Sequence, residues 1–83
     1  MSYSIVIEKK AKKFIDNQPK VQQIRILKAI EKLPSTGDIK PLVKYDEVYR
    51  LRVGDFRIIF TKHDDIFRIN IIDAGARGDI YKK

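Results

Sequence analysis

Three arginines near the middle of the chain are spaced as residues on one face of a β-hairpin are spaced. Arg50, Arg52 and Arg57 flank Gly54-Asp55, and the runs on either side alternate apolar and polar residues. Two residues of this kind between alternating runs form a tight turn, because glycine accepts the positive φ that such turns require. The segment 48–61 therefore predicts a hairpin.

The expected register of this hairpin brings like charges together. The implied cross-strand pairs are Val53 with Phe56, Arg52 with Arg57, and Arg50 with Ile59. All three arginines then share one face, on which we expect no carboxylate. Like charges directly opposite each other cost about 0.2–1 kcal/mol relative to a neutral pair. A sheet that accepts this cost favours an anionic ligand, and we expect the phosphate backbone of RNA.

Composition predicts one small basic domain. The 83 residues suit a single domain, 1–83, and 18 Lys and Arg against 11 Asp and Glu give a net charge of +7. This charge favours a polyanionic partner over a merely solvated basic surface. The chain has no cysteine and one histidine, which excludes disulfides, thiolate metal sites and histidine-rich metal sites. We expect no metal and no cofactor.

The N-terminal residues predict a cytoplasmic location. They include no charged leader followed by an apolar run, so we expect no signal peptide. No apolar stretch approaches the roughly 20 residues that a membrane-spanning helix needs. We expect no membrane contact.

The first half of the chain predicts a strand and two helices. Ser4–Ile7 is rich in β-branched residues, and residues 8–17 place apolar side chains at helical spacing. A second helix is expected from Pro19 to about Leu33, and a short break between helices predicts an antiparallel helical hairpin. The apolar stripe of the second helix is Ile26, Leu27, Ile30 and Leu33, flanked by Ile24 and Ala29. Residues 34–47 predict a long loop with a brief extended piece at 41–43.

The second half predicts the rest of the sheet. After the arginine hairpin we expect a turn at 62–65 and a strand at 66–73, with Phe60 opposite Phe67. That register gathers large apolar side chains on one face, and burial favours it over a slip of one residue. The expected residues of the other face are Arg50, Arg52, Arg57, Ile59, Arg68 and Asn70. The order β-α-α-β-β-β predicts an α+β fold, with both helices on one face of a single antiparallel sheet.

Two phrases of the sequence resemble the RelE/ParE toxin superfamily of type II toxin–antitoxin pairs. They are Tyr49-Arg50-Leu51-Arg52-Val53-Gly54-Asp55-Phe56-Arg57-Ile58-Ile59-Phe60 and Gly75-Ala76-Arg77-Gly78-Asp79-Ile80-Tyr81-Lys82. The resemblance covers essentially the whole chain, implies a RelE-like, microbial-ribonuclease-like fold, and leans toward the RelE branch. RelE toxins cut messenger RNA in the ribosomal A site by attack of the 2′-hydroxyl, without a metal. An acidic antitoxin segment inhibits them. The resemblance thus implies an endoribonuclease with ribosome, message and antitoxin as partners.

The same resemblance assigns roles to particular residues. It implies catalytic roles for Arg52, Arg57, Arg77 and Tyr81. From the basic face itself we further expect RNA binding by Arg50, Arg68 and Lys82. Arg52 stands where some members have a lysine proposed as the general base, and Ala76 stands where many have histidine. Arginine stays protonated at pH values below about 12, so it is a poor general base. Tyr81 could transfer a proton, stack on a base, or pack as an ordinary tail residue.

Two other readings remain open from the sequence. A ParE-like toxin would have the same fold but would inhibit DNA gyrase and cut nothing. A toxin homologue with weakened catalysis would bind the ribosome or RNA only. The arginine trio and the segment from Arg77 to Tyr81 favour the nuclease.

Overall fold

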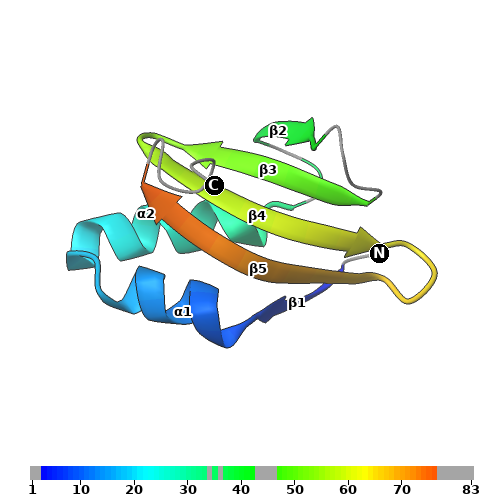
Figure 1. Ribbon diagram of the computed structural model, residues 1–83, viewed down its shortest axis with the longest axis horizontal. Coiled ribbons are helices and arrows are strands. Elements are labelled where there is room, and N and C mark those ends of the chain that lie inside the picture. The colour runs from blue at the N-terminus through cyan, green and yellow to red at the C-terminus, as the bar shows by residue number, and fades with distance from the viewer. Residues whose placement is uncertain (1–2, 34, 36, 43–46, 77–83) are drawn as a thin grey trace.

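The computed structural model describes residues 3–33, 35, 37–42 and 47–76. Its elements, in chain order, are β1 (Ser4–Ile7), α1 (Lys9–Asp16), α2 (Lys20–Glu31), β2 (Asp38–Pro41), β3 (Val48–Val53), β4 (Phe56–His63) and β5 (Arg68–Ala76) (Figure 1). Within these residues, no helix is long and apolar enough to span a membrane.

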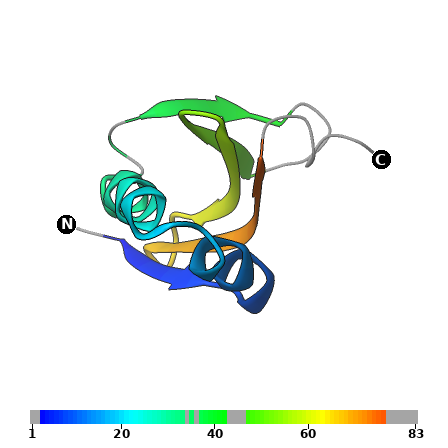
Figure 2. The ribbon, with the colours of Figure 1, turned by 90° about the vertical axis from the view of Figure 1, so that its left-hand side faces the viewer.

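The two helices lie together on one face of the sheet, as the sequence predicts. Figure 2 shows both of them on the concave side of a strongly curved sheet. Helix α1 buries Ala11 and Ile15, and its Phe14 ring packs edge-on against Phe56 of β4 at a centroid distance of 5.9 Å. The expected amphipathic character of α1 is therefore confirmed.

Helix α2 buries a narrower stripe than the sequence predicts. Ile26 and Ile30 are buried, and Leu33 follows the helix into the core. Leu27 and Ile24 are instead 38% and 45% exposed. Successive residues of a helix turn by about 100°, so a helix that lies on a sheet covers one stripe and leaves the residues beside it in solvent.

The predicted α+β architecture is confirmed, but the sheet is mixed rather than wholly antiparallel. The strand order is β1-β5-β4-β3-β2, and β1 runs parallel to β5 while every other pair is antiparallel. No turn joins β1 to β5, so no local sequence signal fixes their relative direction.

A strand that the sequence did not predict forms one edge of the sheet. Residues Asp38–Pro41 form β2 and pair antiparallel with β3, whereas the expected extended piece began at Pro41. The strand is four residues long, largely exposed, and ends in proline. Such short edge strands carry little apolar alternation, which explains why this segment resembled a loop.

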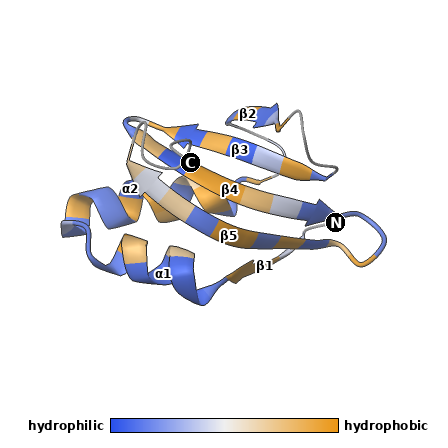
Figure 3. Ribbon diagram, in the orientation of Figure 1, coloured by the Kyte–Doolittle hydropathy of each residue, from blue (hydrophilic) through white to orange (hydrophobic). Residues whose placement is uncertain are grey.

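The predicted register of the arginine hairpin is confirmed. Val53 pairs with Phe56, Arg52 with Arg57 and Arg50 with Ile59, and Gly54 has a φ of 58°. In Figure 3, apolar and polar residues alternate along β3. This alternation directs Leu51 into the core and its arginine neighbours to the other face.

The predicted register between β4 and β5 was wrong. Phe60 pairs with Ile71 and not with Phe67, because β4 continues to His63 and the turn occupies 64–67. Phe67 lies in that turn with a φ of 50°. A bulge then shifts the register, since Ile59 pairs with Asp73. The offset at Phe60 is four residues, an even number, so the apolar side chains still gather on the helix-facing side.

The core lies between the helices and the sheet. Its central side chains come from every layer and are almost fully buried. They are Ala11, Ile15, Ile26, Ile30, Leu33, Leu51, Ile58, Phe60, Ile69, Ile71 and Ala74. No polar or charged residue of the described part is buried with them. The charged groups that could bind a ligand therefore lie outside this core.

Candidate functional site

Three neighbouring strands line up charged residues across the sheet. In the β2-β3-β4 register, Asp38 lies opposite Arg52, which lies opposite Arg57. One step along the strands, Lys40 lies opposite Arg50. Residues directly opposite each other in a sheet project from the same face, so these side chains form one surface. We call Lys40, Arg50, Arg52 and Arg57, together with Asp38, the charged cluster.

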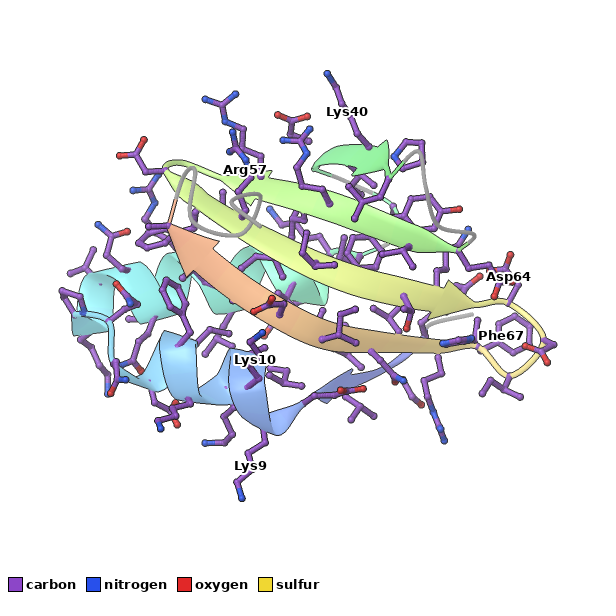
Figure 4. The ribbon with its side chains drawn as sticks, viewed as in Figure 1. Lys9, Lys10, Lys40, Arg57, Asp64 and Phe67 are labelled. Carbon is purple, nitrogen blue, oxygen red and sulfur yellow. The ribbon has the colours of Figure 1, made fainter. Side chains whose placement is uncertain are left out.

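The charged cluster lines an open pocket at the β2 edge. The pocket has a volume of about 460 Å³, and Pro41 and Leu42 complete its lining. Figure 4 shows Arg57 over the sheet and Lys40 extending from β2 away from the body of the protein. The pocket thus combines four cations, one carboxylate and a small apolar wall.

Arg57 is the most exceptional member of the cluster. Its Nε and Nη1 atoms are buried, and no described residue accepts a hydrogen bond from either. Buried polar groups without partners cost about 1–3 kcal/mol each, and charged groups cost more, so proteins seldom leave them unpaired. Guanidinium N–H groups without a protein partner favour an anionic ligand, because their hydrogen bonds to phosphate oxygens are charge-assisted. The geometry at Arg57 fits an anion site.

Arg50 has an acidic neighbour that the sequence did not predict. Its Nη2 atom lies 3.6 Å from Oδ1 of Asp38, and the two side chains are 11% and 50% exposed. The expectation that no carboxylate shares the arginine face was therefore wrong. The error follows from the missed strand, because β2 is what places Asp38 on that face.

Arg52 stays available to a ligand. Its only hydrogen bond to a described residue is a long one, from Nε to the carbonyl oxygen of Gly54 at 3.5 Å. Strand β2 begins opposite Arg52, so the edge of β3 is uncovered beyond this point. The structure thus brings Arg50, Arg52 and Arg57 together, as the sequence predicts.

Arg68 does not join the cluster. It opens β5 and pairs with His63, whereas Arg57 pairs with Gly75 near the other end of the same strand. At about 3.3 Å per residue, this separation is roughly 20 Å. The predicted position of Arg68 along the sheet was wrong, because the β4–β5 register at this end lies four residues from the expected one. Its role in RNA binding remains a prediction.

The remaining predicted site residues lie outside the described part of the chain. They are Arg77, Tyr81 and Lys82, and their roles remain predictions. Ala76, the last described residue, pairs with Phe56 beside Arg57. The last described residue of β5 therefore lies at the same end of the sheet as Arg57.

Two members of the cluster were missed from the sequence. Asp38 and Lys40 alternate with Ile39, which packs against the core. That alternation was the available signal, but it spans only three residues.

A second basic surface lies on the helix side of β3. This groove has a volume of about 370 Å³, and its cations are Arg25 and Lys28 of α2, Lys32 at the C-cap of α2, and Arg52 of β3. Its remaining lining is Ala29, Gly37, Leu51 and Val53. We call this surface the α2 groove. Arg52 lines both the α2 groove and the pocket of the charged cluster.

Tyr3 and Asp64 form a polar contact at the β4–β5 turn, at the opposite end of β4 from Arg57. The Tyr3 hydroxyl donates a hydrogen bond of 2.6 Å to Asp64 Oδ1 in the β4–β5 turn. This bond lowers the pKa of Asp64 and raises the pKa of Tyr3. Among the described residues, no group of three or more His, Cys, Asp or Glu side chains could hold a metal ion.

Comparison with known proteins identifies the fold. No protein-family model matches the sequence, and a search of curated proteins found no match. Solved structures do match. The archaeal RelE–RelB complex from Pyrococcus horikoshii OT3 is 25% identical, with a TM-score of 0.79 over 95% of this chain and 99% of that chain.

Two further structures support the same assignment. The RelB–RelE complex from Methanococcus jannaschii is 28% identical, with a TM-score of 0.75, over 92% of this chain and 94% of that chain. The isolated E. coli RelE toxin shares the fold at 15% identity and a TM-score of 0.77, over 96% and 92% of the two chains. The resemblance to the RelE/ParE toxin superfamily is confirmed.

Proposed function

We propose that this protein is the toxin of a type II toxin–antitoxin pair. It acts in the cytoplasm as a ribosome-dependent endoribonuclease that cleaves messenger RNA in the A site. The likeness to RelE toxins supports this proposal. The observation that carries it is the guanidinium of Arg57, which has two buried nitrogens without a described partner in a basic pocket.

The proposed chemistry needs no metal. Attack by an internal 2′-hydroxyl requires alignment of that hydroxyl with the phosphorus, stabilisation of charge on the phosphate, and movement of protons. Arg57 and Arg52 bind the scissile phosphate, and Arg50 holds a flanking phosphate. A preorganised donor of this kind contributes about 10²–10³ in rate. Arg77 and Tyr81 complete the site in this proposal, and Lys82 adds RNA binding.

The ribosome supplies the alignment in this mechanism. A small, open pocket of about 460 Å³ does not enclose a nucleotide chain. A message already held in a bent conformation needs little further ordering, and correct orientation alone can account for about 7–11 kcal/mol of a barrier. The toxin then contributes mainly electrostatic stabilisation.

Cell-free translation tests this proposal directly. The purified protein is added to a translating extract, and primer extension maps the ends of the message. We expect cuts in register with codons, and no cuts from the Arg57→Ala variant. Intact message with a defect in DNA supercoiling would replace this proposal with gyrase inhibition. Intact message with co-sedimentation on ribosomes would reduce the protein to a ribosome-binding module.

An acidic antitoxin segment is the second proposed partner. The matched archaeal structures are complexes of RelE with RelB. In this chain the α2 groove supports such a partner, because its four cations surround an apolar floor. None of these cations forms an ion pair with a described residue. Acidic side chains would meet the cations, and an apolar side chain would cover the floor. Arg52 also lines the pocket of the charged cluster. A partner bound in the α2 groove would therefore compete with RNA for this arginine.

Charge reversal tests the groove. The variant Lys28→Glu/Lys32→Glu changes two exposed lysines, one in the last turn of α2 and one at its C-cap. The variant Lys9→Glu/Lys13→Glu makes the same change in charge on α1. Fluorescence anisotropy with a labelled synthetic peptide of alternating Glu and Leu measures binding. We expect the α2 variant to lose at least tenfold in affinity and the α1 variant to lose less. Equal losses would show attraction to net charge alone and would contradict a groove-specific partner.

A further inference from the structure

The arginines of the charged cluster do not supply a proton acceptor. Arginine remains protonated throughout the physiological range, so neither Arg52 nor Arg57 can remove the proton of a 2′-hydroxyl. Strand β2 brings a carboxylate to this surface instead. We propose that Asp38 is the general base of the cleavage reaction. This inference rests on the proposed nuclease function.

The register places Asp38 at a suitable distance from the phosphate clamp. Asp38, Arg52 and Arg57 are consecutive partners across three adjacent strands. Neighbouring strands lie about 4.8 Å apart, so the backbones of Asp38 and Arg57 are separated by about 10 Å. Side chains that project from both ends of such a row leave room for one ribose and its phosphate. Arg57 then binds the phosphate while the carboxylate meets the sugar.

The exposure of the ion pair also favours a chemical role for Asp38. The Arg50 side chain is 11% exposed, but that of its partner Asp38 is 50% exposed. Arg50 Nη2 contacts Oδ1 at 3.6 Å, which is longer than a good charge-assisted hydrogen bond. A ligand can therefore reach the carboxylate. Asp38 also repels phosphate, so a pocket used for phosphate binding alone would be better without it.

The proposed step is a balanced transesterification. The carboxylate of Asp38 takes the proton of the 2′-hydroxyl as its oxygen attacks phosphorus, which forms the 2′,3′-cyclic phosphate. The bond between phosphorus and the 5′-oxygen breaks, and that oxygen takes a proton from solvent. Asp38 then returns its proton to water. Arg52 and Arg57 stabilise the charge that develops on the non-bridging oxygens.

Single-turnover cleavage by variants tests the assignment. Asp38→Asn keeps the shape of the side chain but cannot accept the proton, and we expect the rate to fall about 100-fold or more. Asp55→Asn is the matched control, because Asp55 is an exposed carboxylate in the turn between β3 and β4. This variant should cut at the wild-type rate. Asp38→Glu should keep more activity than Asp38→Asn. Thermal melts of all three confirm that they fold.

Chemical rescue separates proton transfer from simple charge neutralisation. We expect formate and then acetate to restore cutting by Asp38→Ala, with acetate more effective because it is the stronger base. Rescue by chloride to the same extent would mean that Asp38 only neutralises Arg50, and it would overturn the assignment. Wild-type rates for Asp38→Asn would also overturn it, while leaving the nuclease function intact. Failure of the wild-type protein to cut would remove the nuclease function and the general base together.

Discussion

Arg57 illustrates a conflict between stability and ligand binding at a single residue. Its Nε and Nη1 atoms lose water in the folded protein and gain no described partner. Leaving such groups unsatisfied costs free energy of folding, and a bound phosphate would recover that cost. A native protein seldom leaves such groups unsatisfied, so a ligand is a physical reason for them at Arg57.

This conflict predicts that Arg57→Ala lowers the cleavage rate without lowering the stability of the fold. We expect Arg57→Ala to lower RNA cleavage by about 10²–10³-fold, the effect typical of removing one donor to a developing negative charge. We expect the free energy of unfolding to stay the same or to rise slightly, because the substitution removes buried groups without partners. Single-turnover kinetics and urea denaturation provide the two measurements.

Arg50→Ala is the comparison variant for the stability measurement. It removes the partner of Asp38, so it should reduce stability somewhat more than Arg57→Ala does. A loss of several kcal/mol for Arg57→Ala would assign Arg57 a structural role and would contradict its assignment as a phosphate ligand.

At the level of residues, the sequence predicted the arginines of the site but not its carboxylate. The arginines could be predicted because Gly54-Asp55 fixes the hairpin, and the alternating pattern then fixes which side chains share a face. The position of Asp38 could not be predicted in this way. Its place depends on an edge strand of four residues, which pairs with β3 across a long connection.

At the level of elements, a polar contact fastens the start of β1 to the β4–β5 turn. Tyr3 donates to Asp64, and its ring packs edge-on against Phe67 at a centroid distance of 5.6 Å. Phe67 has a positive φ, which is uncommon for an aromatic residue, and this contact helps to hold it there. Strand β1 has a single neighbour in the sheet, β5, so this contact adds to a limited set of interactions.

The contact predicts a defined dependence of stability on pH. The hydrogen bond from Tyr3, with the nearby Lys62, lowers the pKa of Asp64 in the folded state. A carboxyl whose pKa is lowered by folding stabilises the protein above its unfolded pKa, and this contribution disappears as pH falls through the folded pKa. We expect Asp64→Asn to be less stable than wild type at pH 7, with the difference starting to shrink below about pH 4 and vanishing only below the folded pKa of Asp64. Urea denaturation across this range measures it.

Asp65→Asn changes the adjacent carboxyl of the same turn and serves as the control for this experiment. Its stability should follow that of the wild type through the acid range. If both variants gave the same pH profile, the effect would reflect net charge and not the bond to Tyr3.

The predicted elements show where local signals are sufficient. The strand at Ser4–Ile7, both helices and the arginine hairpin follow from periodicity and turn chemistry within short windows. The β4–β5 register could not be derived in this way. Its turn places Phe67 outside the strand, and a bulge beyond Phe60 adds a residue to β5. Neither feature has a glycine or proline to mark it.

At the scale of the molecule, the charge of +7 is distributed over separate surfaces. The charged cluster lies on one face of the sheet, the α2 groove lies on the helix side, and Arg52 lines both. Arg68 lies at the far end of β5. If overall charge governed RNA binding, all these cations would contribute alike. If the pocket of the charged cluster governs RNA binding, only the cations that contact phosphate will contribute to the affinity.

Salt dependence of binding distinguishes these two cases. Each phosphate of a single strand that a protein neutralises adds about 0.7 to the slope of log affinity against log salt concentration. We expect Arg57→Gln to reduce this slope by about 0.7 with a labelled single-stranded RNA oligonucleotide. Arg68→Gln should leave it unchanged, because roughly 20 Å separates the two residues along the sheet and the Debye length at 0.1 M salt is about 10 Å. Equal reductions by both variants would extend the RNA contact over the whole face, and the charged cluster would then be only one part of it.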